Sequence, residues 1–266
     1  MDRSFERLDK LLVARGITGS RERAQALVMA AKVLVDGRRV TKAGQRVASD
    51  ARLELLGDDL PFVSRGGLKL RHALEAFSVD VRDLRAADVG ASTGGFTDCL
   101  LQNGASRVYA IDVGYGQLAW KLRQDPRVIT IERQNIRSIP PERIPEPLDL
   151  AVIDASFISL RLVIPAILPF LKQEGRLIAL IKPQFEAGRE RVGKGGVVRD
   201  PRVHEEVCAT VADFCRTLGL HVGGITPSPI LGPKGNREFL ILLHRQNPEP
   251  APSGTIPESS FETIPE

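Results

Sequence analysis

Apolar residues near the amino terminus recur at the spacing of a helix. Leu8, Leu11 and Leu12 would lie on one face of a first helix. Ser20 precedes a second helical stretch, residues 21–31, and its hydroxyl is suited to capping the first turn. The start of the chain therefore predicts two short helices joined by a turn.

A tight hairpin is predicted directly after the second helix. The apolar run Val33-Leu34-Val35 precedes Asp36-Gly37, and Val40 follows. Asp-Gly favours the two-residue turns that join twisted strands. Two helices followed by a hairpin predict a small α+β module over residues 1–60.

A different pattern covers the chain from about residue 81 to residue 245, where strand-like and helix-like stretches alternate. Such alternation predicts an α/β domain, with helices on both faces of a parallel sheet. Several prolines make a loop between the third strand, which precedes Asn135, and the fourth strand, residues 148–153. They are Pro140, Pro141, Pro145 and Pro147. The main predicted strands are residues 84–90, 107–112, 148–153, 177–181, 222–225 and 239–243, and the main predicted helices are residues 95–103 and 204–218.

These patterns divide the chain into parts. Residues 1–60 form the first module, 61–66 a linker and 67–245 the α/β domain. The acidic, Pro-rich tail, 246–266, is predicted to be disordered because it has too few apolar residues to form a core.

The charge of the chain is uneven. The formal net charge is +4, yet the tail contains four glutamates and no Lys or Arg, and residues 1–49 contain eleven Lys or Arg against five Asp or Glu. Such a basic surface suits RNA phosphates, although solvated helix faces would explain the same charges. The predicted RNA-binding residues are Arg3, Arg7, Arg15, Arg21, Arg23, Lys32, Arg38, Lys42 and, in the second domain, Arg65.

The three cysteines, Cys99, Cys208 and Cys215, form no Cys-x-x-Cys pair. A structural zinc site and an iron–sulfur cluster are therefore not expected, and no metal is predicted. The charged amino terminus does not resemble a signal peptide, and no apolar run approaches the ~20 residues that cross a bilayer. We expect a cytoplasmic protein with no membrane partner.

A glycine-rich turn between the first strand and helix of the α/β domain predicts a cofactor site, because ligands bind beyond the carboxyl ends of parallel strands. Asp112, at the end of the second strand, could accept hydrogen bonds from a ribose diol. The spacing of the glycines does not match the Gly-x-Gly-x-x-Gly of nicotinamide dinucleotides, and S-adenosyl-L-methionine suits the looser loop. The predicted cofactor-binding residues are Asp88, Gly90, Ala91, Ser92, Thr93, Gly94, Gly95, Phe96, Asp112, Asn135 and Asp154. Asn135 would meet adenine, or alternatively cap a loop.

Four charged residues at predicted strand or helix ends are candidates for catalysis: Lys69, Asp154, Lys182 and Glu238. Lys182 is the candidate base that activates a hydroxyl, with Asp154 and Glu238 to orient it. Structural ion pairs are the alternative for each residue taken singly. Amino-group methylation is disfavoured because two prolines are missing after Asp154, and carbon-5 methylation because no cysteine lies near the fourth or fifth strand.

The first module resembles the S4-like RNA-binding domain, which implies structured RNA as its ligand. The resemblance rests on three runs in the order of that family: Arg7-Leu8-Asp9-Lys10-Leu11-Leu12, Ser20-Arg21-Glu22-Arg23-Ala24 and Val33-Leu34-Val35-Asp36-Gly37.

The second domain resembles the FtsJ-type ribose 2′-O-methyltransferases, whose Lys-Asp-Lys-Glu tetrad matches Lys69, Asp154, Lys182 and Glu238. This resemblance implies a Rossmann-like, S-adenosylmethionine-dependent fold with a seven-stranded, mostly parallel sheet. With the first module, residues 1–245 are similar to the TlyA family, whose members are often labelled hemolysins. That family implies 2′-O-methylation of cytidine in ribosomal RNA, 16S, 23S or both.

Two other functions are weighed against methyl transfer. A membrane-active hemolysin is disfavoured because no amphipathic segment combines a wide apolar face with aromatic anchors. A non-catalytic RNA-binding or ribosome-assembly protein would need only the first module and would leave the cofactor loop and the tetrad without a purpose. The predicted partners are ribosomal RNA and ribosomal subunits, and the sequence leaves monomer and dimer open.

Overall fold

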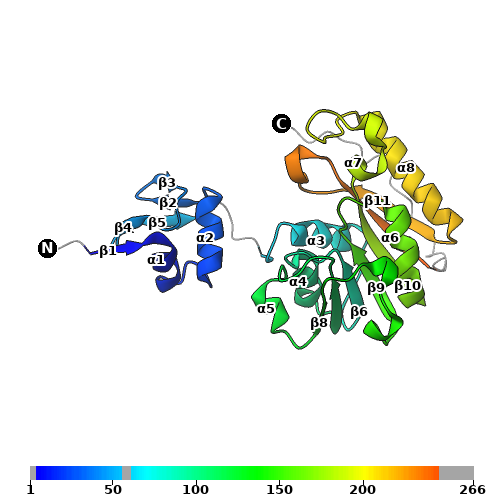
Figure 1. Cartoon of the computed structure of the whole chain (residues 1–266), viewed down its shortest axis with the longest axis horizontal. Coiled ribbons are helices and arrows are strands. Elements are labelled where there is room, and N and C mark those ends of the chain that lie inside the picture. The colour runs from blue at the N-terminus through cyan, green and yellow to red at the C-terminus, as the bar shows by residue number, and fades with distance from the viewer. Residues whose placement is uncertain (1–3, 56–60, 246–266) are drawn as a thin grey trace. The chain divides into compact units, whose positions relative to one another are not determined.

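A computed structural model describes residues 4–55 and 61–245 of the chain (Figure 1). The predicted tail, residues 246–266, lies outside the described residues. The chain divides into two compact units, Met1–Leu60 and Pro61–Glu266.

Residues 4–55, the described part of the first unit, form two short helices and two small sheets. The hydroxyl of Ser20 accepts a hydrogen bond from the Arg23 amide, as predicted for a helix cap. Asp36 and Gly37 have φ values of 50° and 75°, which is the backbone of the predicted two-residue hairpin turn. Two strand pairings were not predicted: β1 (Phe5–Arg7) with β4 (Arg46–Ala48), and β5 (Leu53–Leu55) with β2 (Val33–Val35). The elements are β1 (Phe5–Arg7), α1 (Leu8–Ala14), α2 (Arg21–Met29), β2 (Val33–Val35), β3 (Arg38–Val40), β4 (Arg46–Ala48) and β5 (Leu53–Leu55).

A buried carboxylate joins the two helices of this unit. Asp9 in α1 is fully buried and accepts hydrogen bonds from Arg7, Arg21 and Gln25 at 2.9 to 3.0 Å. The Arg7 guanidinium, the largest influence, and the Arg21 and Gln25 side chains hold the pKa of Asp9 well below its usual range. Asp9 therefore holds the side chains of Arg7 and Arg21 in place and also links the two helices.

Replacing Asp9 by Ala should destabilise the first unit by about 2 kcal/mol, since hydrogen bonds to a charged group contribute about 1.5–3 kcal/mol each and the released side chains can be solvated. Amide hydrogen exchange on the full chain measures this change: exchange should accelerate in residues 4–55 and stay constant in residues 61–245. Glu54→Gln is the matched control, because the Glu54 carboxylate pairs with Arg52 at an exposed site. Equal exchange in Asp9→Ala and Glu54→Gln would show that the buried carboxylate contributes no more than an exposed one.

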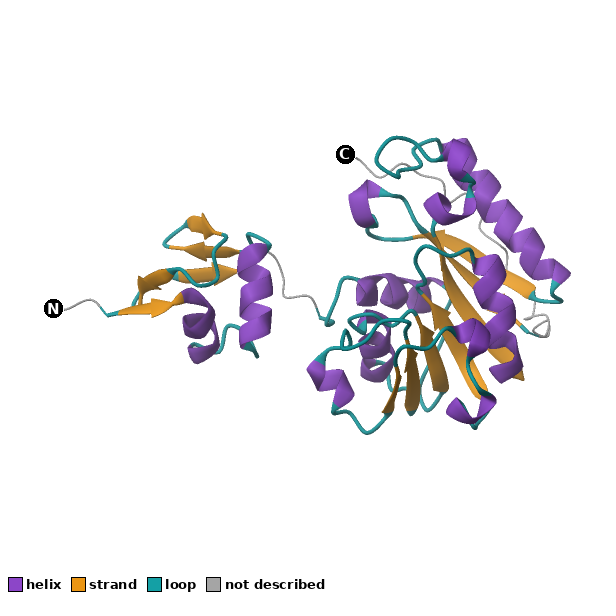
Figure 2. Ribbon diagram, viewed as in Figure 1, coloured by secondary structure: helices purple, strands orange, loops and turns teal. Residues whose placement is uncertain are grey.

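The second unit contains a seven-stranded sheet with the strand order β11-β12-β10-β9-β6-β7-β8. Helices lie on both faces of the sheet, as predicted (Figure 2). The helices and strands are α3 (Gly66–Ala76), β6 (Arg85–Val89), α4 (Gly95–Gln102), β7 (Arg107–Ile111), α5 (Trp120–Arg123), β8 (Val128–Ile131), β9 (Leu148–Ile153), α6 (Leu160–Ile167), β10 (Leu171–Ile181), α7 (Pro183–Glu186), α8 (Pro201–Thr217), β11 (His221–Pro227) and β12 (Phe239–His244). Short 3-10 turns are η1 (Ile136–Ser138), η2 (Pro141–Arg143), η3 (Leu168–Phe170), η4 (Arg189–Arg191) and η5 (Pro233–Gly235).

One strand departs from the parallel arrangement. Strands β10, β9, β6, β7 and β8 pair in parallel, whereas β12 is antiparallel to both β10 and β11. The prediction of a seven-stranded, mostly parallel sheet is confirmed, and the prediction of a wholly parallel sheet is wrong. Because β12 runs in the opposite direction, its first residues lie at the edge where the parallel strands end, which brings Glu238 to that edge.

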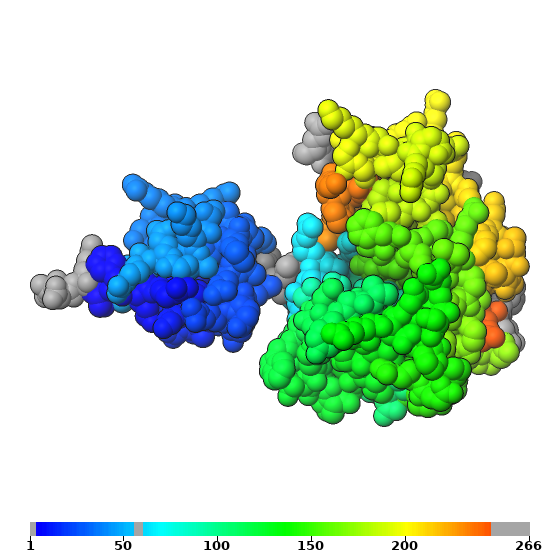
Figure 3. All heavy atoms as spheres, in the orientation of Figure 1, coloured from blue at the N-terminus to red at the C-terminus, as the bar shows by residue number. Residues whose placement is uncertain are grey.

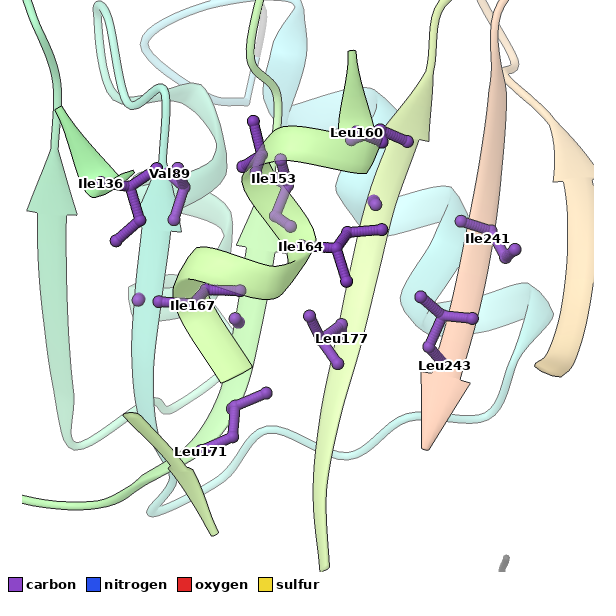
Figure 4. Close-up of a cluster of buried hydrophobic side chains, with 14 of the residues drawn as sticks. Val89, Ile136, Ile153, Leu160, Ile164, Ile167, Leu171, Leu177, Ile241 and Leu243 are labelled. Carbon is purple, nitrogen blue, oxygen red and sulfur yellow. The ribbon is translucent and has the colours of Figure 1, made fainter. Parts of the chain in front are cut away.

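Two apolar clusters cover the two faces of the sheet. Side chains of α6, including Ile164 and Ile167, pack on strand residues such as Ile153, Leu177 and Ile241 (Figure 4). The other cluster joins α3 and α4 to the opposite face. Helix α8, labelled in Figure 1, belongs to the yellow-to-gold part of the surface at the outer side of this unit in the space-filling view (Figure 3). Strands that are buried on both faces cannot shift register without exposing apolar side chains, so they fix the loops at their ends.

Candidate active site

The glycine-rich loop between β6 and α4 has little room for side chains. Gly90 has φ 87°, and a Cβ at this position would lie 2.7 Å from the Asp154 carbonyl oxygen. Gly94 has φ 97° and caps α4, and Cβ atoms at Gly94 or Gly95 would overlap neighbouring side chains. The backbone of residues 90–95 can therefore approach a ligand closely, which is what a cofactor cradle requires.

Asp88 lies fully buried beneath this loop. Its Oδ2 accepts hydrogen bonds from the Thr97 amide at 2.8 Å and the Thr97 hydroxyl at 2.7 Å. Its Oδ1 is buried and has no hydrogen-bond partner among residues 4–55 and 61–245, and Asp88 lines the pocket beside this loop. Burial, the largest influence, raises the pKa of Asp88 to about 7, and the Thr97 hydrogen bonds oppose this rise. A cationic donor of a ligand would satisfy Oδ1 and favour the ionised form.

Unfolding experiments should detect the raised pKa of Asp88. Between its ordinary pKa of 3.8 and about 7, the folded state binds more protons than the unfolded state. Stability from this group is therefore present at low pH and is lost as pH rises to about 7. Urea unfolding at pH 5 and pH 8 should show a larger loss of stability for the wild type than for Asp88→Asn. The same pH dependence in both proteins would contradict a raised pKa.

Two of the predicted cofactor-binding residues, Asp112 and Asn135, form hydrogen bonds with backbone amides of the protein. The Asp112 carboxylate accepts hydrogen bonds from the amides of Ser92 and Gly114, each at 2.7 Å, and so ties the loop after β7 to the glycine-rich loop. The Asn135 side chain accepts a hydrogen bond from the Arg137 amide at 3.0 Å and caps η1. Asn135 therefore caps a loop, which was the alternative to a contact with adenine. Asp112 contributes to the site by holding the glycine-rich loop in place.

The four candidate catalytic residues form two ion pairs. Lys182 Nζ lies 2.6 Å from Asp154 Oδ1 and donates a hydrogen bond to Ser156 Oγ at 2.8 Å. Lys69 Nζ lies 2.5 Å from Glu238 Oε2. Lys69, Lys182 and Glu238 are all buried, with exposed fractions of 8%, 7% and 1%. Two cations and two carboxylates balance each other, so the site can be buried without an uncompensated charge.

One cavity of about 420 Å³ joins the cradle to both ion pairs. The predicted residues that line it are Arg65, Lys69, Asp88, Gly90, Ala91, Ser92, Thr93, Gly95, Phe96, Asp154, Lys182 and Glu238. Gly94, Asp112 and Asn135 are not among its lining residues. The lining residues that were not predicted are Ser64, Gly66, Ser156, Ile230, Gly232 and Pro233. Ser156 was the one most open to prediction, because it follows Asp154 by two residues at the end of β9.

Some of the predicted RNA-binding residues of the first unit form hydrogen bonds within the fold, and others are exposed or half-buried. Arg7 and Arg21 bind Asp9, and Arg15 donates to the carbonyl oxygens of Ser49 and Ala51. These three side chains stabilise the fold, and the parts of them that are exposed can still meet a ligand. Of the other predicted RNA-binding residues, Arg38 and Lys42 are exposed, Arg23 and Lys32 are half-buried, and Arg3 lies outside the described residues.

No group of three or more His, Cys, Asp or Glu residues suited to a metal ion occurs within residues 4–55 and 61–245. In the same described parts of the chain, no helix is long and apolar enough to cross a membrane.

The sheet with its antiparallel β12, the glycine-rich cradle after β6 and the pocket beside it define the class: a Rossmann-like domain of the S-adenosylmethionine-dependent methyltransferase fold. Solved methyltransferases share this fold at low identity. A Listeria monocytogenes protein labelled as an S-adenosylmethionine-dependent methyltransferase has a TM-score of 0.51 at 18% identity, and the match covers 69% of this chain and 100% of that chain.

Comparison with known proteins identifies the family. The FtsJ-like methyltransferase family matches residues 62–245, and the S4 domain matches residues 6–53. The 16S/23S rRNA (cytidine-2′-O)-methyltransferase TlyA of Mycobacterium tuberculosis (strain ATCC 25618 / H37Rv) is 46% identical over 241 residues, 90% of each chain. Hemolysin A of Brachyspira hyodysenteriae is 40% identical over 88% of this chain and 98% of its own. The solved structure of a hemolysin-labelled protein from Streptococcus thermophilus has a TM-score of 0.73 at 46% identity, covering 92% of this chain and 90% of its own.

The chain therefore belongs to the FtsJ-like methyltransferase family and, with its S4 domain, to the TlyA proteins within it. This confirms the resemblances of the sequence to the S4-like domain, to the FtsJ-type methyltransferases and to the TlyA family.

Proposed function

We propose that this protein transfers a methyl group from S-adenosylmethionine to the ribose 2′-hydroxyl of a cytidine in ribosomal RNA. The observation that carries the proposal is the pair of buried Lys–carboxylate contacts, Lys69–Glu238 and Lys182–Asp154, in the same pocket as the glycine-rich cradle. The relative from M. tuberculosis is named for 16S and 23S RNA, and one from Campylobacter jejuni for 23S RNA alone. The substrate is accordingly 16S RNA, 23S RNA or both.

The pocket fits S-adenosylmethionine. The backbone of residues 90–95 would hold its amino-acid end, and the unpartnered Asp88 Oδ1 would accept a hydrogen bond from its ammonium group. When bound, the cofactor supplies an electrophilic methyl group on a sulfonium centre.

Lys182 is the proposed acceptor of the 2′-hydroxyl proton. To accept a proton, Lys182 acts as the neutral amine, which has two N–H donors and one lone pair. Asp154 and Ser156 accept hydrogen bonds from the two donors. The lone pair is left for the proton of the substrate hydroxyl in the pocket that Lys182 lines. Asp154 and Ser156 hold Nζ in place, so that a positioned hydroxyl meets it without prior reorganisation.

The S4 domain is the proposed docking module for structured RNA. Its exposed Arg38 and Lys42 are suited to phosphate contacts, which fix position on RNA without reading its sequence. Arg65 lines the pocket and is the proposed RNA contact of the methyltransferase domain. With ribosomal subunits as substrate, we place the protein in the cytoplasm.

Transfer of a labelled methyl group from S-adenosylmethionine to purified small subunits, large subunits and free ribosomal RNA tests this function. We expect 2′-O-methylcytidine, identified by mass and by resistance of its phosphodiester bond to alkali. Methylation on a base would contradict the ribose acceptor. Cofactor binding without labelling of any RNA would contradict the substrate class, and lack of cofactor binding would contradict methyl transfer itself.

A further inference from the structure

A buried asparagine joins two segments at the rim of the pocket. Asn236 is 3% exposed and lies between β11 and β12, two residues before Glu238. Its Nδ2 donates to the carbonyl oxygens of Gly196 at 3.0 Å and Pro233 at 3.2 Å, and its Oδ1 accepts from the Val198 amide at 3.2 Å. One side chain thus joins residues 232–236, here called the rim segment, to residues 193–198, here called the glycine turn.

The glycine turn depends on such contacts for its shape. It closes through hydrogen bonds from Gly193 N to Val197 O at 3.1 Å and from Gly196 N to Gly193 O at 3.0 Å. Gly195 and Gly196 have φ values of 83° and 79°, and glycine backbone is conformationally free in solution. Val198 is fixed from both sides, because its amide binds Asn236 and its carbonyl oxygen contacts His204 Nε2 at 2.9 Å.

The rim segment lies directly against the Glu238 carboxylate. Gly232 and Pro233 line the pocket, and the Gly232 amide donates to the Asn236 carbonyl oxygen at 2.8 Å. A Cβ at Gly232 would overlap Glu238 Oε1, which is the oxygen that does not bind Lys69. Movement of the rim segment would therefore change the space and the solvation around the Lys69–Glu238 pair.

We propose that Asn236 is a positioning residue for the reaction, a role that rests on the proposed methyl transfer. It fastens the rim segment to the glycine turn, so that Glu238 stays covered and aligned with Lys69 while the substrate occupies the pocket. Asn236 has no hydrogen bond to the cradle formed by residues 90–95. Its loss should therefore affect turnover and leave cofactor affinity unchanged.

The Asn236→Ala variant separates this role from a purely structural one. We expect kcat to fall about tenfold, which is ~1.4 kcal/mol in the activation free energy, with the Kd for S-adenosylmethionine within about twofold of the wild type. Amide hydrogen exchange should accelerate in residues 193–198 and 228–238 and stay constant in residues 88–97. Asn103→Ala is the matched control, because Asn103 caps the far end of α4 through a hydrogen bond to the Cys99 carbonyl oxygen. It should leave kcat unchanged.

Asn236→Asp provides a second readout. Aspartate keeps the acceptor for the Val198 amide but can donate to the Gly196 carbonyl oxygen only when protonated. Its kcat relative to that of the wild type should therefore rise as pH falls, whereas Asn236→Ala should show no such recovery.

Two outcomes would overturn the positioning role. Unchanged exchange in both segments would show that Asn236 does not hold them together, and a parallel loss of kcat, cofactor affinity and exchange protection throughout residues 61–245 would show a structural role alone. Lack of methyl transfer by the wild type would overturn the proposed function instead. The exchange comparison needs no RNA and would still decide whether Asn236 joins the two segments.

Discussion

Replacing Lys182 by Met should lower methyl transfer by roughly a thousandfold, within the ~10²–10⁴-fold range that general acid–base groups contribute. Methionine keeps most of the length of the side chain, but it cannot accept the hydroxyl proton or donate to the substrate oxygen. Single-turnover rates with saturating S-adenosylmethionine and ribosomal subunits measure the loss. Cofactor binding should persist, because the backbone of residues 90–95 and Asp88 are unchanged.

Lys172→Met is the matched control for this substitution. Lys172 also forms an ion pair with an aspartate, Asp149, but it lies in the early part of β10, away from the lining of the pocket. Its replacement should leave the methyl-transfer rate unchanged. A similar loss of rate in both variants would mean that lost stability, and not lost chemistry, explains the effect of Lys182→Met.

Lys182→Arg distinguishes a base from a positioning charge. Arginine keeps a positive charge and hydrogen-bond donors, but it remains protonated at any working pH. If Lys182 accepts the proton, Lys182→Arg should be nearly as inactive as Lys182→Met. Activity close to that of the wild type would show that the charge positions the substrate and that water removes the proton.

The sequence predicts the parts of this site that depend on strand ends. Asp154 and Lys182 each follow a run of apolar residues, and the ends of parallel strands lie at one edge of a sheet, so the Lys182–Asp154 contact follows from the pattern. The hairpin at Asp36-Gly37 is equally predictable, because few residues tolerate two successive positive φ values.

Other features depend on contacts that no periodicity encodes. The direction of β12 is set by how the chain turns after β11, and an apolar run such as residues 239–243 is the same in either direction. The Asp112 carboxylate could bind a ligand or backbone amides, and only the path of the loop brings Ser92 and Gly114 within 2.7 Å of it. The partners of Asn236 are likewise distant in sequence.

The Lys69–Glu238 pair should affect stability and activity in separable ways. Glu238→Leu leaves the Lys69 ammonium buried without a counter-charge and should destabilise the second unit by about 3–5 kcal/mol, as removal of one partner of a buried pair does. Lys69→Met should cost a similar amount. In the double variant the uncompensated charge is gone, so most of the lost stability should return. Urea unfolding of the wild type, both single variants and the double variant measures this coupling.

Methyl transfer should not return with stability in the double variant. The pair lines the pocket, and a substrate hydroxyl positioned by charges would find two apolar side chains in their place. The exposed pair Arg71–Glu75, 3.9 Å apart on α3, is the matched control and should show coupling below about 1 kcal/mol, with activity retained. If the Lys69 and Glu238 substitutions were simply additive in stability, the two groups would not interact as a buried pair. If the double variant regained methyl transfer, the pair would serve only the fold, and the reaction would depend on Lys182 and Asp154 alone.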